Sequence, residues 1–251
     1  MILSILAFLF VFTIVVLVHE SGHFIAARKT GVKAYEFSIG FPFSPKIATL
    51  FRHGETEFTL RLLPLGGFVS FSKDAEEGTA HQFLSEKRWK RFIIASAGSV
   101  FNIAFAFIAL LAAYLLGRDM GLIDGAAASL KAIETATAGT VKLLFGLFSG
   151  RGSLEGLSGP IGIAALAGKA AHGGLAGLVY FTGMLSLSLG ILNLLPLPAL
   201  DGGHILIILI ESIKRRPLSI GAYKAISAAG ISFLLVLTLI VSYKDILRIF
   251  A

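Results

Sequence analysis

The amino-terminal segment of the chain restricts the fold most strongly, because residues 1–18 carry no charged side chain and are long enough to enter a bilayer. The segment ends at His19-Glu20-Ser21-Gly22-His23. On a helix, histidines at i and i+4 lie on one face. This spacing suits two ligands of one zinc ion, and the intervening glutamate is placed to activate a water molecule. Polar groups at membrane depth are costly, so we predict a zinc site at the end of a first membrane helix.

The overall composition is that of an integral membrane protein. The 251 residues are 55% hydrophobic and 15% charged, and the mean hydropathy is +0.84. There is no cysteine, so histidine and carboxylate side chains must hold any zinc ion. The net charge is +7, but the basic residues flank the hydrophobic runs as topology signals do, and we predict no nucleic-acid partner. The first segment lacks a basic n-region and an A-x-A cleavage site, so we expect it to be retained.

Four hydrophobic runs are long enough to span a bilayer, which requires roughly 20 apolar residues each. We predict an α-helical membrane protein with about four transmembrane helices, near residues 2–25, 92–116, 174–210 and 225–243. Prolines, glycines and an aspartate interrupt the third run between residues 196 and 203. Residues 126–148 are weakly amphipathic, and we predict an interfacial helix there and not a fifth span.

The distribution of lysine and arginine predicts the orientation in the membrane. About two thirds of the 22 basic residues lie in the loop between the first two spans or in the short loop after the third. These two loops lie on the same side, and the positive-inside rule assigns that side to the cytoplasm. We therefore expect a multi-pass protein with both termini outside the cytoplasm.

Residues 46–62, between the first two spans, have the pattern of a membrane-associated β-hairpin. Apolar and polar side chains alternate on both sides of a turn at residues 52–55. Pro64-Leu65-Gly66-Gly67 follows, and its glycines permit a close backbone approach. The sequence leaves two interpretations open: the hairpin is only a packed plug, or it offers an exposed strand edge that pairs with an extended peptide.

Two histidines do not complete a catalytic zinc site, which normally takes three protein ligands and a water molecule. Asp201 is the only acidic residue between Glu155 and Glu211, and it follows Pro196 and Pro198. Prolines break a helix, and irregular backbone at membrane depth is tolerated where it lines a cavity. We predict that Asp201 is the third ligand; the alternative is an aspartate that caps the helix restarting at residue 202. Outside this set, His204 is a candidate hydrogen-bond partner of the site.

Two motifs together resemble the site-2 protease family of intramembrane zinc metalloproteases: His19-Glu20-x-x-His23 on a first membrane helix and Asn193-x-x-Pro196-x-Pro198-x-Leu200-Asp201-Gly202-Gly203. Pro64-Leu65-Gly66-Gly67 and Ser158-Gly159-Pro160-Ile161-Gly162 are similar to motifs of the bacterial regulator-of-sigma-E protease branch. Ala97-Gly98-x-x-x-Asn102 resembles the second span of that branch. The similarity covers nearly the whole chain.

The resemblance implies a mechanism and a set of site residues. Zinc would be bound by His19, His23 and Asp201, with Glu20 as the catalytic acid and base. Substrate would be engaged by Asn193, Pro196 and Pro198, with Gly66 and Gly67 as further candidates. Members of the branch cut transmembrane segments of anti-sigma factors and, in some cases, remnant signal peptides. The implied partners are such transmembrane proteins and the lipid bilayer, in the bacterial inner (cytoplasmic) membrane.

One feature of that branch is missing from the sequence. Its members usually carry PDZ domains outside the cytoplasm between the second and third spans, whereas residues 118–128 form only a short connection here. A PDZ domain needs on the order of a hundred residues. We therefore expect residues 1–251 to form a single membrane-embedded metalloprotease domain.

Two other functions stay open. A membrane zinc transporter could use the same ligands, although transporters usually show paired repeats with matching helix breaks, and only the third run is broken here. An inactive zinc-binding protein is the second alternative, and the intact Glu20 argues against it.

Overall fold

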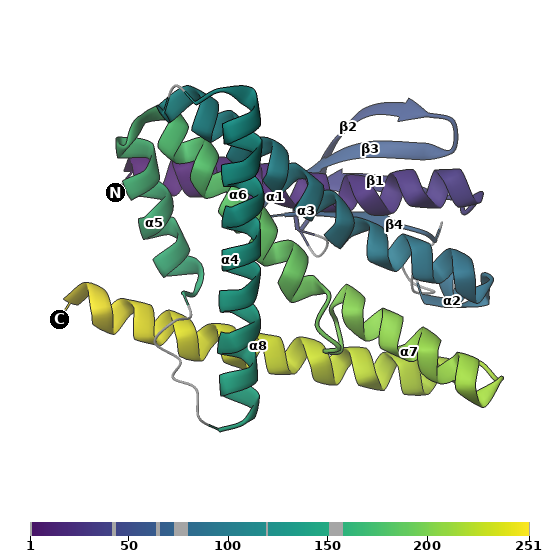
Figure 1. Cartoon of the computed structure of the whole chain (residues 1–251). Helices are drawn as coiled ribbons and strands as arrows, with labels where there is room; N and C mark the ends of the chain where they lie inside the picture. The colour runs from purple at the N-terminus through teal and green to yellow at the C-terminus, as the bar shows by residue number, and fades with distance from the viewer. Residues whose placement is uncertain are drawn as a thin grey trace. The chain divides into compact units, whose positions relative to one another are not determined.

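Most of the chain is helical in the computed structural model, which describes residues 2–41, 44–63, 66–72, 80–118, 120–150 and 158–250 (Figure 1). The helices are α1 (Ile2–Thr30), α2 (Ala80–Ser85), α3 (Arg88–Arg118), α4 (Leu122–Phe148), α5 (Pro160–His172), α6 (Gly174–Asn193), α7 (Asp201–Lys214) and α8 (Ile220–Phe250). The strands are β1 (Glu36–Ile39), β2 (Lys46–His53), β3 (Thr56–Arg61) and β4 (Gly67–Ser70).

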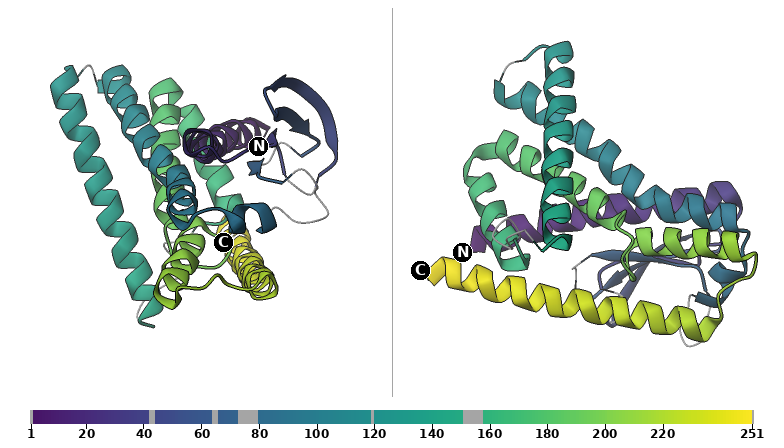
Figure 2. Two further views of the ribbon diagram at one scale, coloured as in Figure 1. Left: turned by 90° about the vertical axis from the view of Figure 1, so that its right-hand side faces the viewer. Right: turned by 60° about the horizontal axis from the view of Figure 1, so that its bottom comes forward.

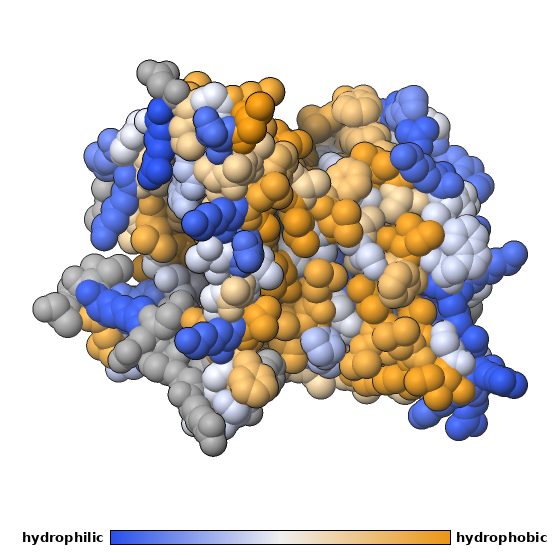
Figure 3. Space-filling view, in the orientation of Figure 1, coloured by the Kyte–Doolittle hydropathy of each residue, from blue (hydrophilic) through white to orange (hydrophobic). Residues whose placement is uncertain are grey.

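Four of the described helices are long and apolar enough to cross a membrane: Ile2–Thr30, Arg88–Arg118, Gly174–Asn193 and Ile220–Arg248. Large apolar side chains on these helices, such as Ile108 and Leu239, are exposed, and hydrophobic side chains cover much of the face in Figure 3. Exposed apolar surface on this scale requires a lipid environment. The chain is a multi-pass α-helical membrane protein, which confirms the predicted fold class.

The third hydrophobic run is divided between two helices. α6 ends at Asn193, residues 194–200 are not helical, and α7 begins at Asp201. Pro196 and Pro198 cannot donate to a helical hydrogen-bond ladder, and Ala199 adopts a φ of 73°. The predicted interruption is present, but the spanning helix ends near residue 193 and not near residue 210, because the prolines terminate it.

The contacts of the chain divide it into two compact units. The first unit comprises Met1–Val11, Ile103–Ile191 and Ser232–Ala251, and the second comprises Phe12–Asn102 and Leu192–Ile231. The predicted site residues described by the structure all lie in the second unit.

Small residues allow close helix packing in the first unit. Gly183 of α6 lies so close to α3 that an added Cβ would stand 3.1 Å from Leu110 Cγ. Gly125 of α4 lies against Leu111 and Leu115 of α3 in the same way. α4 occupies the segment where the sequence predicts an interfacial helix, and this helix is visible at the left edge of the first view in Figure 2.

Helix α5 was not predicted, and its amino-terminal end explains the Ser158–Gly162 motif. Asp245 of α8 is buried, and it accepts a hydrogen bond of 2.8 Å from the main-chain N–H of Gly162. A Cβ on Gly159 or Gly162 would stand 2.9 Å from a carboxylate oxygen of Asp245. The two glycines therefore leave the space in which an α8 carboxylate meets the amino terminus of α5, where the helix dipole favours negative charge.

In the second unit the four strands form one sheet with the order β2-β3-β1-β4. β2 and β3 are the predicted hairpin, with Gly54 at a φ of 61° in its turn. β1 pairs parallel to β3 and antiparallel to β4, so β4 is an edge strand. The alternating pattern predicted β2 and β3, but β1 and β4 have only four residues each and were missed.

The sheet is held against α1 by an aromatic cluster. Phe24 of α1 meets Phe37 of β1 and Phe58 of β3, and the three ring centroids are 5.5 to 5.6 Å apart. Phe24 directly follows His23, so this packing sets the position of the sheet relative to the histidine pair.

Candidate metal centre

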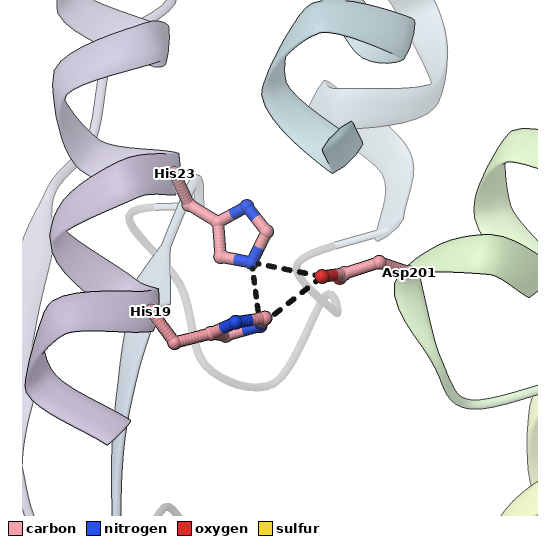
Figure 4. A group of neighbouring side chains, drawn as sticks. All are labelled: His19, His23 and Asp201. Atoms are coloured by element: carbon pink, nitrogen blue, oxygen red, sulfur yellow. Dashed lines mark hydrogen bonds and ion pairs between the residues drawn. The ribbon is translucent and has the colours of Figure 1, made fainter. Parts of the chain in front are cut away.

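Three predicted metal-binding side chains converge in the second unit. His19 and His23 project from one face of α1, and Asp201 lies in the first turn of α7 (Figure 4). The carboxylate Oδ2 of Asp201 is 3.1 Å from His19 Nε2 and 3.4 Å from His23 Nε2, and the two Nε2 atoms are 3.2 Å apart. Asp201 is not the helix cap considered as the alternative, because Leu200 holds the N-cap position.

These separations fit a zinc ion. Ligand atoms at about 2.0–2.1 Å from a tetrahedral zinc ion are about 3.3 Å from one another. Oδ2 of Asp201 is buried and accepts no hydrogen bond from the residues that the structure describes. A buried carboxylate oxygen with two imidazole nitrogens around it needs a counter-charge, and a divalent cation supplies one.

The Nδ1 atom of each imidazole contacts a polar group of α3. His23 Nδ1 is 2.7 Å from the main-chain carbonyl of Ile94, so Nδ1 carries the proton and donates to that oxygen. His19 Nδ1 is 3.3 Å from the side-chain amide of Asn102. An amide orientation in which Asn102 Oδ1 accepts from Nδ1–H leaves His19 Nε2 available, as a metal ligand requires. Both Nε2 atoms are thus presented toward Asp201.

Two glycines allow α1 and α3 to approach closely at this point. A Cβ on Gly98 would stand 2.5 Å from His23 Nε2 and 2.7 Å from His19 Cε1. A Cβ on Gly22 would stand 2.5 Å from the carbonyl oxygen of Ala97. The Ala97-Gly98-x-x-x-Asn102 motif therefore supplies both the space for the imidazoles and a partner for His19.

Glu20 lies between the histidine pair and the edge strand β4. Its carboxylate is hydrogen-bonded to the main chain of Val69, and it interacts electrostatically with both histidines and Asp201. A Cβ on Gly67 would stand 3.5 Å from Glu20 Cγ and 2.8 Å from the Ser38 carbonyl. Gly67 therefore lets β4 run close to the glutamate.

The predicted substrate residues are distributed over two segments. Asn193, at the end of α6, has its side-chain nitrogen 3.5 Å from His19 Nε2, at the margin of the cluster. Pro196 and Pro198 lie in the non-helical segment before Asp201. Gly66, with a φ of 95°, precedes β4, whereas Pro64 and Leu65 of the same motif lie outside the described residues.

A cavity of about 290 Å³ opens beside the cluster. It is lined by His23, Phe71, Phe83, Ile94, Ala95, Asp201, His204 and Tyr223. His204, the candidate partner of the site, has its Nδ1 2.8 Å from the hydroxyl of Tyr223 and is not hydrogen-bonded to the three clustered residues. Tyr223 was missed by the sequence analysis, because a tyrosine on an apolar helix carries no motif.

The chain is similar to known proteins over nearly its full length. The profile of peptidase family M50 matches residues 7–237. A provisionally named zinc metalloprotease of Rhizobium meliloti is 26% identical over 95% of each chain. The zinc metalloprotease RasP of Bacillus licheniformis is 24% identical over 98% of this chain and 99% of its own length. The regulator of sigma-W protease RasP of Bacillus subtilis is 36% identical over 53% of this chain and 31% of its own length.

The alignments with the first two of these proteins extend over 358 and 419 positions, more than this chain has residues, so the relatives contain inserted segments. The profile match covers most of the chain, including both histidines, Glu20 and Asp201. The chain belongs to peptidase family M50, the site-2 proteases, and is a zinc metalloprotease.

Proposed function

We propose that this metalloprotease is an intramembrane endopeptidase in which His19, His23 and Asp201 hold the zinc ion and Glu20 transfers the proton. The observation that carries the proposal is the convergence of the three ligand atoms within 4.8 Å of one another. Zinc held by these residues would polarise the scissile carbonyl and would lower the pKa of a water molecule there to about 7. The Glu20 carboxylate would accept a proton from the attacking water molecule and return it to the leaving amine.

Edge strand β4 is the element that we propose to hold the substrate extended. A transmembrane helix must unwind before cleavage, because its carbonyl groups are engaged in its own hydrogen bonds. The carbonyls of Gly66 and Ser70 accept hydrogen bonds from Gly40 and Tyr35, on the β1 side. In an antiparallel ladder the intervening residues, Gly67 and Val69, then direct their main-chain groups to the free edge, where Glu20 lies.

Of the two interpretations of the hairpin, this geometry favours the strand edge, with β4 and not the hairpin itself as the edge in question. Asn193, which lies beside His19, can donate and accept hydrogen bonds to an extended peptide. We propose that Pro196 and Pro198 keep the segment after Asn193 irregular, so that its main-chain groups stay available to substrate.

The Glu20→Gln variant tests the proton transfer. The amide is nearly isosteric but cannot accept a proton, so zinc content should stay at the wild-type level while cleavage of a transmembrane substrate is lost. Chelator treatment of the wild type should have the same effect on cleavage. Near-wild-type turnover by zinc-loaded Glu20→Gln would refute the assigned role, and a wild type that never cleaves would favour transport or inactive zinc binding.

Asp201→Ala tests the ligand set, with Asp124→Ala as the matched control at an exposed position of α4 in the other unit. Zinc content should fall markedly in the first variant and stay unchanged in the second. Full zinc retention by Asp201→Ala would remove Asp201 from the set of zinc ligands.

Asn193→Ala and Pro196→Leu test the segment that we propose to engage substrate. Both variants should impair cleavage far more than zinc binding, and unchanged turnover in both would limit their segment to a structural role.

We propose anti-sigma-factor-like proteins or remnant signal peptides as substrates, in a bacterial inner membrane with both termini outside the cytoplasm. The name of the Bacillus subtilis relative and the distribution of basic residues support this proposal. Co-expression of each substrate class with the wild type or with Glu20→Gln would test the substrate proposal. A true substrate should be cut by the wild type and should remain as an uncut membrane fragment with the variant. A carboxyl-terminal alkaline phosphatase fusion tests the orientation, because it should be active if the carboxyl terminus lies outside the cytoplasm.

We further propose that residues 1–251 act as one metalloprotease domain without a PDZ filter. α3 ends at Arg118 and α4 begins at Leu122, so only the residues before 122 of the predicted connection at residues 118–128 link the two helices, and they leave no room for a domain. The expected consequence is weak discrimination between a full-length substrate and one whose outer domain has been clipped. The test compares cleavage of both substrate forms by this chain and by a version with a PDZ domain grafted after Arg118. If both proteins fail equally to cleave the full-length substrate, the proposal is contradicted.

A further inference from the structure

A cavity lies between three helices of the first unit, and its lining contains none of the predicted zinc ligands. It has a volume of about 410 Å³ and is lined by Tyr114, Arg118, Ala128, Lys131, Ala132, Thr135, Ala136, Tyr180 and Met184. A second cavity of about 250 Å³ shares Tyr114, Arg118 and Tyr180 with it. These three residues therefore form a wall common to both cavities.

Each helix contributes a pair of residues spaced by one turn. Tyr114 and Arg118 come from α3, Lys131 and Thr135 from α4, and Tyr180 and Met184 from α6. Residues at i and i+4 share one face of a helix, so each of the three helices lines the cavity with a single face. The site is thus made by tertiary packing of α3, α4 and α6, which Figures 1 and 2 show as neighbours.

The polar groups around the cavity are mainly hydrogen-bond donors. The Arg118 guanidinium is 5.5 Å from the Tyr114 ring, and the Tyr114 and Tyr180 rings meet edge-on at 6.0 Å. The two tyrosine hydroxyls are hydrogen-bonded to each other, so one phenolic O–H is left to donate.

The lining contains two cations and no acidic side chain. In the part of the chain that the structure describes, neither Arg118 nor Lys131 forms an ion pair. Two like charges beside one cavity repel each other, and an anion between them removes the repulsion.

We propose that this cavity binds the phosphate group of an anionic phospholipid. Arg118 closes a membrane-spanning helix, and tyrosine and arginine at such ends lie at headgroup depth. Basic pockets between transmembrane helices are suited to anionic headgroups, and arginine can hold a phosphodiester through two parallel hydrogen bonds.

The apolar part of the lining favours a lipid over a peptide carboxylate. Ala128, Ala132 and Ala136 are spaced by four residues on α4 and form an apolar stripe in the lining, to which Met184 of α6 also belongs. Acyl chains can lie along such a surface with no hydrogen-bond partner, whereas the amide groups of a peptide would need partners there. A bound lipid would therefore join α4 to α3 and α6.

The test measures the preference of the purified full chain for phosphatidylglycerol over phosphatidylcholine, by native mass spectrometry in a neutral detergent. Two cations near a membrane surface should give the wild type a preference of about 30-fold. The Arg118→Gln/Lys131→Gln variant should lose most of it. The control Lys142→Gln/Lys169→Gln removes two exposed charges that belong to the same unit but do not line the cavity. This control should keep the preference for phosphatidylglycerol.

A second variant separates the cavity from charge alone. Ala132→Phe keeps both cations but fills the apolar stripe, and it should also abolish the preference while leaving thermal stability without lipid unchanged. The proposal is overturned if the wild type does not distinguish the two lipids, if both charge variants lose the preference equally, or if inorganic phosphate competes as well as the lipid does, since the ligand would then be a soluble anion.

Discussion

The Gly98→Ala variant should damage the zinc site through one added methyl group. The new Cβ would stand 2.5 Å from His23 Nε2, whereas ordinary contact begins at 3.4 Å. The imidazole would have to retreat by about 0.9 Å, while zinc sites tolerate ligand distances only within about 0.2 Å of their ideal values. His19 is affected as well, because the same Cβ would stand 2.7 Å from its Cε1.

Neither helix can move away at low cost. His23 is tied to α3 by its hydrogen bond of 2.7 Å to the Ile94 carbonyl, and Gly22 already packs against the carbonyl of Ala97. Loss of a supporting contact alone typically lowers metal affinity 10- to 100-fold, and direct displacement of a ligand should exceed that range. We therefore expect zinc affinity to fall by at least about 100-fold, which corresponds to about 2.7 kcal/mol.

The assay is competition for zinc between the purified protein and a chelator of known affinity, with helix content measured in parallel by circular dichroism. Gly221→Ala is the matched control, because that glycine is also helical and an added Cβ would have nothing within 4 Å. The control should bind zinc as the wild type does. Zinc affinity of Gly98→Ala within about twofold of the wild type, with normal helix content, would show that the helices adjust and that our reading of the contact is wrong.

Three further changes probe other contacts of the second unit. Asn102→Ala removes the side chain 3.3 Å from His19 Nδ1 and should weaken zinc binding about 10-fold, as measured by chelator competition. Arg91→Met leaves buried Glu211 without its partner at 2.7 Å and should destabilise the protein by about 3–5 kcal/mol in denaturant unfolding, whereas the Arg91→Met/Glu211→Met double variant should recover most of the loss. Equal losses in the single and double variants would contradict that account. Gly230→Ala forces the segment between α6 and α7 to shift and should lower the turnover number about 100-fold with zinc retained; unchanged turnover would show that the segment moves freely.

The burial of the Arg91–Glu211 pair does not follow from the composition of the sequence around Arg91. Residues 87–91 have the composition of an interfacial anchor, and Trp89 is exposed as such an anchor requires. Arg91, however, is 3% exposed and bonds to Glu211 of α7. Trp89 and Arg91 are two residues apart and therefore lie on opposite faces of α3, and the sequence does not reveal which face will be covered.

The sequence by itself determined the membrane class, the four spans and the pairing of His19 with His23. These features depend on short-range properties, namely apolar run length and the i, i+4 geometry of a single helix. The break before Asp201 was also readable, because proline ends a helix wherever the helix packs. The hairpin of β2 and β3 followed from alternation of adjacent residues.

The sequence proposed Asp201 as a partner of the histidines, but only the tertiary structure decided how the surrounding groups meet them. Asp201 is more than 170 residues away from them in the chain, and its approach depends on how α7 packs in the second unit. The same packing places Gly98 beneath the imidazoles, Asn102 beside His19 and edge strand β4 next to Glu20. A four-residue strand has too little pattern to be recognised alone, and its position depends on pairing with β1 and on the Phe24 cluster, which are contacts between segments distant in the chain.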